Sequence, residues 1–139
     1  MCIRDRNYID KEDKRKGIVY REVFRNGLLK KMTITDSTNH SLLIKRYYDN
    51  GQLGYHRKLY NNGNYDIKVF YKNGQLFDER KYLDGRLFNA SIYDRDGNEL
   101  DIGSFKNGNG ILKSYSFKTG DLNGKYEYVN GELIKSETF

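Results

Sequence analysis

The sequence predicts an all-β protein, an elongated open antiparallel β-meander built from tandem hairpin repeats. Three observations carry this prediction. In the first two, a glycine turn recurs at a nearly constant spacing, and an aromatic residue precedes it at a fixed place. The third is the composition of the 139-residue chain, which holds 14 glycines and 13 tyrosines but no proline. Hydrophobic residues make up only 37%, against about 45–50% with glycine included in ordinary domains, so we expect no thick two-layer core.

The expected turns follow one another regularly along the chain. A glycine preceded by Asn, Asp or Thr marks each of them: Gly27, Gly51, Gly63, Gly74, Gly85, Gly97, Gly108, Gly120 and Gly131. From Gly51 onward these glycines are almost evenly spaced, so that alternate ones mark a longer unit, a hairpin of about 23 residues. The gap from Gly27 to Gly51 is twice the ordinary one, and Asn39 stands at its midpoint, as a repeat without its glycine would.

The strands between these turns follow from simple geometry. Asn-Gly and Asp-Gly supply the positive φ angles of tight hairpin turns. Turns spaced by about 11–12 residues leave about 7 residues per strand, a typical length, and predict ten or eleven strands. Residues 65–71 and 122–128 alternate polar and apolar side chains as strands do. The aromatic before a turn and the leucine after it should meet across the two strands.

The N-terminal part of the chain is set apart from these repeats. Residues 1–6 resemble a translated sequencing adapter, so the true N-terminus would be missing and the localisation stays open between cytoplasmic and exported. Residues 7–19 form a basic segment, and the repeat domain spans 20–139. Of the net charge of +6, residues 1–70 carry +7 (15 basic, 8 acidic) and residues 71–139 carry −1 (10 basic, 11 acidic). Such a basic region either binds phosphates and acidic membranes or is a solvated edge.

The repeat unit, aromatic-x-(Asn/Asp)-Gly-x-Leu, resembles the MORN-repeat variant of bacterial YwqK-type proteins, which are named as antitoxin components of toxin–antitoxin systems. The stretches that carry the resemblance begin at Tyr48, Tyr71, Tyr82 and Tyr128, and it covers roughly residues 20–135. It implies an open meander of β-hairpins. It also implies an antitoxin-like partner of a toxin, or a secreted or surface protein of gut bacteria, since members of the family are found in both settings.

Residues for catalysis or metal binding are scarce, and we expect neither an enzyme nor a cofactor. The only cysteine is Cys2, and the two histidines, His40 and His56, lie in a degenerate turn and in mid-strand, where we expect both to be solvated. The Asp94–Asn98 stretch superficially resembles a calcium loop. However, its glycine comes fourth, and the EF-hand needs glycine sixth, so we interpret it as a repeat turn.

Binding is the remaining class of function, and tyrosines are its first candidates because they offer large contact area at low entropic cost. The candidate interaction surface is a ladder of repeat tyrosines, whose alternative role is to stabilise hairpins: Tyr48, Tyr60, Tyr71, Tyr82, Tyr93 and Tyr128. We therefore expect a non-catalytic protein-interaction module. The alternatives are a structural surface protein and a basic module for anionic lipid or nucleic acid, with the last using Arg46, Tyr47, Tyr48, Tyr55, Arg57 and Lys58. Open sheet edges also make edge-to-edge self-association plausible.

Overall fold

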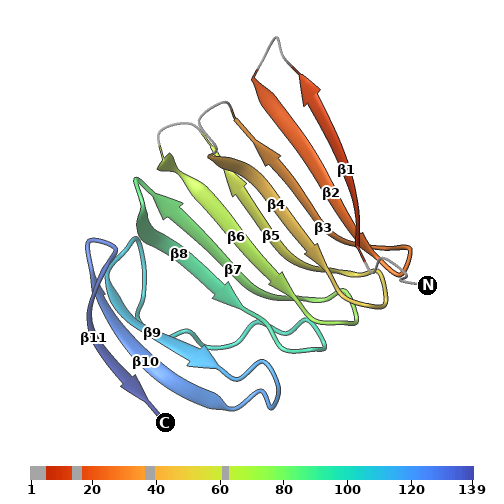
Figure 1. Ribbon diagram of the computed structural model, residues 1–139. Helices are drawn as coiled ribbons and strands as arrows, with labels where there is room; N and C mark the ends of the chain where they lie inside the picture. The colour runs from red at the N-terminus through yellow and green to blue at the C-terminus, as the bar shows by residue number, and fades with distance from the viewer. Residues whose placement is uncertain (1–5, 14–16, 37–39, 61–62) are drawn as a thin grey trace.

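The chain forms eleven antiparallel strands in two sheets, as a computed structural model that describes residues 6–13, 17–36, 40–60 and 63–139 shows (Figure 1). The strands are six to eight residues long. The prediction of an open, all-β meander of ten or eleven short strands is therefore confirmed. No helix among these residues is long and apolar enough to cross a membrane.

The larger sheet holds eight strands that pair with their neighbours in chain order, without a crossover. In that order they are β1 (Arg6–Asp13), β2 (Ile18–Arg25), β3 (Leu28–Thr35), β4 (Ser41–Tyr47), β5 (Leu53–Leu59), β6 (Tyr65–Phe70), β7 (Leu76–Leu83) and β8 (Arg86–Ile92). The sheet thus begins at Arg6, the last residue of the adapter-like stretch, and its first strand runs into the predicted basic segment of residues 7–19. Residues 1–5 of the adapter-like stretch, and Asn39 in the degenerate turn, lie outside the described residues.

The smaller sheet has three strands, β9 (Gly110–Tyr115), β10 (Leu122–Val129) and β11 (Glu132–Thr138), with β10 in the middle. In Figure 1 it curls around the β8 end of the larger sheet. Between β8 and β9, where the repeat spacing predicts one more strand, only isolated bridges form, at Tyr93–Glu99 and Lys106–Asn109.

A tight corner at Gly103 prevents the segment between β8 and β9 from forming a continuous strand. The φ of Gly103 is +86°, and a Cβ there would lie 2.6 Å from the carbonyl oxygen of Ile111, so only glycine fits. The Asp101 carboxylate accepts hydrogen bonds from the Gly103 amide at 2.8 Å and from Lys113 Nζ at 2.8 Å. The meander bends at this corner, and the remaining strands form a second sheet.

A small apolar core fills the space between the two sheets. Its buried side chains form two clusters, one of Tyr71, Phe77 and Ile92, the other of Leu87, Phe105 and Leu112. Phe77 comes from the β-bulge that follows Val69 in the β6–β7 pairing, where one extra residue is left without an opposite partner. The rest of the larger sheet is a single layer, which agrees with the low hydrophobic content.

Seven of the nine repeat turns fall into two kinds. At four of them both central residues have positive φ, and the pairs are Asn26-Gly27, Asp84-Gly85, Asn107-Gly108 and Asn130-Gly131. At Gly51, Gly74 and Gly97 only the glycine does, and its amide donates to the carbonyl three residues back. Leucine meets the expected aromatic only at two-residue turns, as in Tyr82–Leu87 and Tyr128–Leu133.

Core packing gives a direct test of this fold, because Leu112 and Ile111 are neighbours in β9 with opposite exposure. Leu112 is fully buried and Ile111 is 41% exposed. We expect Leu112→Ala to lower the free energy of unfolding by about 2–5 kcal/mol and Ile111→Ala by less than about 1 kcal/mol. Chemical denaturation of the two variants measures both values. Equal losses would contradict the packing of the small sheet onto the large one.

Candidate binding surface

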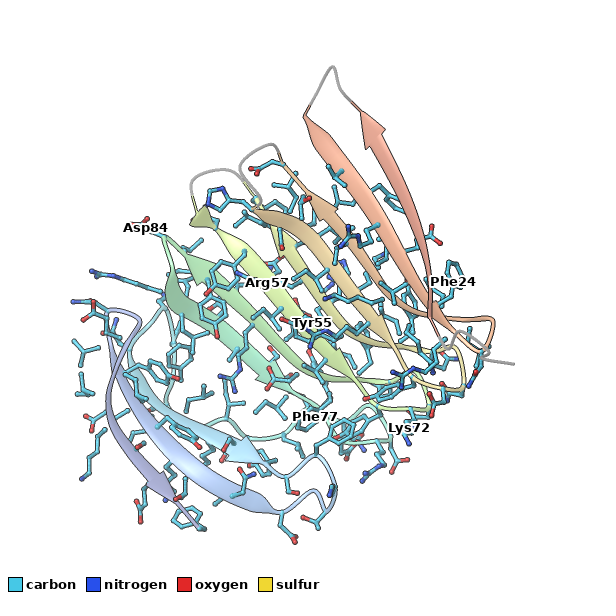
Figure 2. The ribbon with its side chains drawn as sticks, viewed as in Figure 1. Phe24, Tyr55, Arg57, Lys72, Phe77 and Asp84 are labelled. Atoms are coloured by element: carbon cyan, nitrogen blue, oxygen red, sulfur yellow. The ribbon has the colours of Figure 1, made fainter. Side chains whose placement is uncertain are left out.

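The larger sheet has two faces that differ in character. We call inner the face that the three-stranded sheet covers at one end, where Val69, Tyr82 and Ala90 pack onto the core clusters. Alternation along each strand and the pairing register then assign the other positions. Tyr55 and Arg57 of β5 lie opposite Val69 and Ile67 of β6 and so share the inner face. Figure 2 shows both side chains near the middle of the sheet.

Arginine and lysine are divided between these two faces. In β4, β5 and β7 the two residue types are adjacent in the chain, so alternation puts them on opposite faces. Following the register across the sheet, the inner face holds Arg46, Arg57 and Arg80, and the outer face holds Lys45, Lys58, Lys68 and Lys81. Arginine differs from lysine because its planar guanidinium stacks on aromatic rings and binds carboxylates and phosphates with two parallel hydrogen bonds.

The inner face of β3 to β6 contains no carboxylate. At the regularly paired positions its charged side chains are Lys31, Arg46 and Arg57, and none of them takes part in an ion pair among the described residues. The first inner carboxylate is Asp78 in β7, whose Oδ1 lies 3.1 Å from Arg80 Nε. Burial alone would lower the pKa of Arg80, but the Asp78 carboxylate outweighs this effect and raises it. Positive charge is thus unbalanced on the inner face of β3 to β6.

Tyrosine rings support these arginines. The Arg46 guanidinium lies 5.3 Å from the ring centre of Tyr55, and that of Arg57 lies 4.9 Å from Tyr65. Tyr65 in turn stacks on Tyr82, with 4.4 Å between the ring centres. Arg57 Nε is buried and has no hydrogen-bond partner among the described residues. The stacking restricts the arginine side chains before any ligand arrives, and one donor remains unsatisfied.

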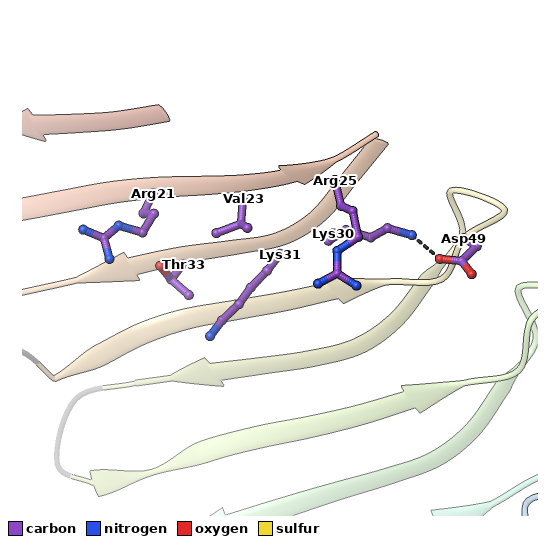
Figure 3. A pocket seen from close by; sticks show the side chains of 7 residues that line it. All are labelled: Arg21, Val23, Arg25, Lys30, Lys31, Thr33 and Asp49. Atoms are coloured by element: carbon purple, nitrogen blue, oxygen red, sulfur yellow. Dashed lines mark hydrogen bonds and ion pairs between the residues drawn. The ribbon is translucent and has the colours of Figure 1, made fainter. Parts of the chain in front are cut away.

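An open hollow of about 550 Å³ continues this basic surface onto β2 and β3 (Figure 3). It is lined by Arg21, Val23, Arg25, Lys30, Lys31, Thr33 and Asp49. The only carboxylate of this lining, Asp49, forms an ion pair with Lys30, which lowers the pKa of Asp49. The hollow is therefore suited to negatively charged groups.

The predicted tyrosine ladder does not lie on one surface. Three of the tyrosines come from turns at one edge of the sheet: Tyr48, Tyr71 and Tyr93. The hydroxyl of Tyr48 donates a hydrogen bond to the Phe70 carbonyl (2.5 Å), and that of Tyr71 donates one to the Tyr93 carbonyl (2.8 Å). The others come from the opposite turn edge, and only one of them, Tyr60, is exposed, at 46%. Tyr82 stacks on Tyr65, and Tyr128 meets Phe105 edge-on. In this arrangement most of the ladder stabilises the repeat.

Of the six residues named for nucleic-acid binding, only some come together. Arg46, Tyr55 and Arg57 share the inner face, whereas Lys58 lies on the outer face. Tyr48 lies in the turn edge with its hydroxyl bonded to Phe70, and Tyr47 lies opposite Leu53 at a bulge. The alternation of Arg and Lys along β4 and β5 is the signal that sequence reasoning missed.

The remaining candidates occupy turns or the outer face. Asp94 Oδ1 accepts hydrogen bonds from the amides of Asp96 and Asn98, both at 2.9 Å, so the calcium-like stretch is a side-chain-capped turn. No group of three or more potential metal ligands occurs in the described part of the chain. His40 lies close to Asp36, and His56 is half-buried on the outer face among lysines.

Comparison with known proteins adds no identification. No protein-family model matches the chain, and a search of the curated proteins finds no significant match.

His56 gives the outer face a measurable pH dependence. Burial, then Lys45 and Lys68, lower the pKa of His56 below its ordinary value of 6.5. The unfolded chain therefore binds a proton at higher pH than the folded chain, so stability is complete above about pH 6.5 and falls as the pH drops through the folded-state pKa. We expect His56→Gln to lose less stability than the wild type between about pH 7.5 and 5.5.

The control for this measurement is Lys81→Met, which removes a lysine from the same face that is not among the groups acting on His56. It should leave the wild-type pH dependence intact, while Lys45→Met should reduce it partly. Thermal unfolding at the two pH values gives the comparison. Identical pH profiles for the wild type and His56→Gln would refute the assignment.

Proposed function

We propose that this chain is a non-catalytic protein-interaction module that binds an acidic partner on the inner face of its larger sheet. The observation that carries the proposal is the division of charge across the sheet: arginines and no carboxylate on the inner face of β3 to β6, lysines mixed with acids on the outer face. Electrostatic complementarity of this kind steers association and selects partners.

The outer face offers a contrast within the same strands. Lys58 lies opposite Asp66, and Lys68 lies opposite Glu79, so each of these lysines faces an acidic residue across the strands. Such cross-strand pairs stabilise a sheet by roughly 0.2–1 kcal/mol each. Arg46, by contrast, lies between Lys31 and Tyr55. The inner arrangement places like charges side by side, which costs stability unless an acidic ligand offsets it.

The shape of the surface supports an extended contact. The larger sheet is open, and its inner basic residues span β3, β4 and β5. The hollow over β2 and β3 adjoins them through Lys31. A partner that lies across these strands would meet several cations at once.

The resemblance to YwqK-type MORN-variant proteins suggests the class of protein to which the partner belongs. In that family's naming the partner would be a toxin, so we propose an antitoxin-like role. The alternative, a structural surface protein of a host-associated bacterium, predicts that the gene encodes an N-terminal export signal. A toxin gene beside this one would favour the first role.

A second candidate ligand is single-stranded nucleic acid. It is favoured by one observation, the Arg46–Tyr55 and Arg57–Tyr65 pairs on the inner face, because such ligands use basic and aromatic side chains together. Tyr65 is covered by Arg57 on one side and Tyr82 on the other. That packing leaves little ring surface for a base to stack on, so an acidic protein fits better.

Charge reversal on one face tests the proposal. We expect Lys31→Glu combined with Arg46→Glu to abolish capture of an acidic protein from a lysate of the source organism. Because the interaction is electrostatic, binding to the unaltered chain should weaken at high salt. The matched control is Lys45→Glu with Lys68→Glu, which makes the same change of charge on the outer face and should retain the partner.

Three results would count against this proposal. Equal loss of the partner in both double variants would place binding elsewhere. No partner at any salt concentration would remove the protein-interaction role. Retention of an oligonucleotide in place of an acidic protein, with steep salt dependence, would favour the nucleic-acid alternative. Circular dichroism of each variant establishes that the sheet is intact.

A further inference from the structure

The last strand of the smaller sheet presents an open edge. Every residue of β11 is exposed, and within the described structure its only strand partner is β10. Two large apolar side chains are prominent here, Ile134 at 57% and Phe139 at 63% exposure. Unpaired backbone groups on an exposed edge strand form a ready template for another strand.

The backbone shows which β11 groups are free to pair. The Phe139 amide donates to the Asn123 carbonyl of β10 at 3.0 Å. In an antiparallel pair the hydrogen-bonded positions alternate, so Lys135 and Glu137 also direct their amides and carbonyls toward β10. Ser136 and Thr138 direct theirs toward the open edge. A strand that joins β11 must therefore bond to Ser136 and not to its two neighbours.

Charge selects the register. In the β10–β11 pair, Lys135 lies opposite Glu127 and Glu137 lies opposite Lys125. A second β11, placed antiparallel with Ser136 opposite Ser136, brings Lys135 of each copy opposite Glu137 of the other. One row of side chains across the four strands then reads Glu127, Lys135, Glu137, Lys125, with the last two from the second copy. The charges alternate along the whole row.

We propose that two copies of this chain associate through β11, antiparallel and centred on Ser136, to form a continuous six-stranded sheet. Ser136 and its symmetry mate exchange both backbone hydrogen bonds, and the Lys135–Glu137 pairs occupy the closer, non-hydrogen-bonded positions. Registers centred on Lys135 or Glu137 place like charges opposite each other and require backbone groups that already face β10. The two-fold arrangement is closed and stops at two copies.

The interface consists of one strand from each copy, so its size is at the low end for specific association. We therefore expect a dimer that forms and dissociates with protein concentration. The inner face of the larger sheet lies outside this contact and remains free. The proposal is thus independent of the proposed acidic partner.

Cysteine cross-linking tests the register. In a Cys2→Ser background, Ser136→Cys should form a disulfide-linked dimer on mild oxidation, because directly opposite Cα atoms lie about 5.5 Å apart, within disulfide range. The control, Thr138→Cys, lies two residues from the axis, so the two thiols would be about 13 Å apart along the strands. It should not cross-link. Equal cross-linking of both, or of neither, would overturn the proposal.

Charge exchange tests the same contact without cysteine. Lys135→Glu and Glu137→Lys should each reduce the dimer fraction in sedimentation velocity, with a dissociation constant raised about tenfold, while the double variant should restore it. Thermal unfolding of each variant controls for the altered pairing with β10. A chain that is monomeric at every concentration, one that forms open-ended filaments, or a double variant without rescue would each overturn the proposal.

Discussion

The structure depends on contacts between turns that lie one hairpin apart. Tyr48 and Tyr71 donate to main-chain carbonyls 22 residues ahead, and so do Asn50 (2.8 Å) and Asn73 (3.2 Å). At the opposite edge the Gly131 amide donates to the Gly108 carbonyl at 2.8 Å. These hydrogen bonds fix the position of each of these turns relative to the turn one hairpin away. A sheet that is one layer thick over most of its width has little core to align its strands, and these contacts supply the alignment.

Alignment of the turns determines what each face presents. Because a shift of one residue would exchange the two faces of a strand, the separation of Arg46, Arg57 and Arg80 from the lysines exists only in this register. Stacking on Tyr55 and Tyr65 lets arginine cover an apolar surface that no second layer protects. The same side chains therefore protect the sheet and offer a surface for an acidic partner.

The turn positions could be predicted from sequence, because Asn-Gly and Asp-Gly act locally. The number of strands agrees because β1, which lies ahead of the predicted repeat domain, replaces the strand that does not form between β8 and β9. The two kinds of turn could not, since Asn50-Gly51 and Asn130-Gly131 are the same dipeptide and only Asn130 has a positive φ. The corner at Gly103 was overlooked because no Asn or Asp precedes that glycine. The composition of the inner face could not be predicted either. Bulges shift the alternation of side chains along the strands, so the residues that share a face are known only once the pairing register is known.

Amide hydrogen exchange, measured residue by residue in the native state, tests the turn-to-turn contacts most directly. The amides of Gly85, Gly108 and Gly131 donate to carbonyls outside their own turns, at 3.3, 3.0 and 2.8 Å. If these contacts align the strands, the three amides exchange only through opening of the sheet, as slowly as the strand amides beside them. Exchange as fast as in an unfolded peptide would show that each turn stands alone, and would contradict the account.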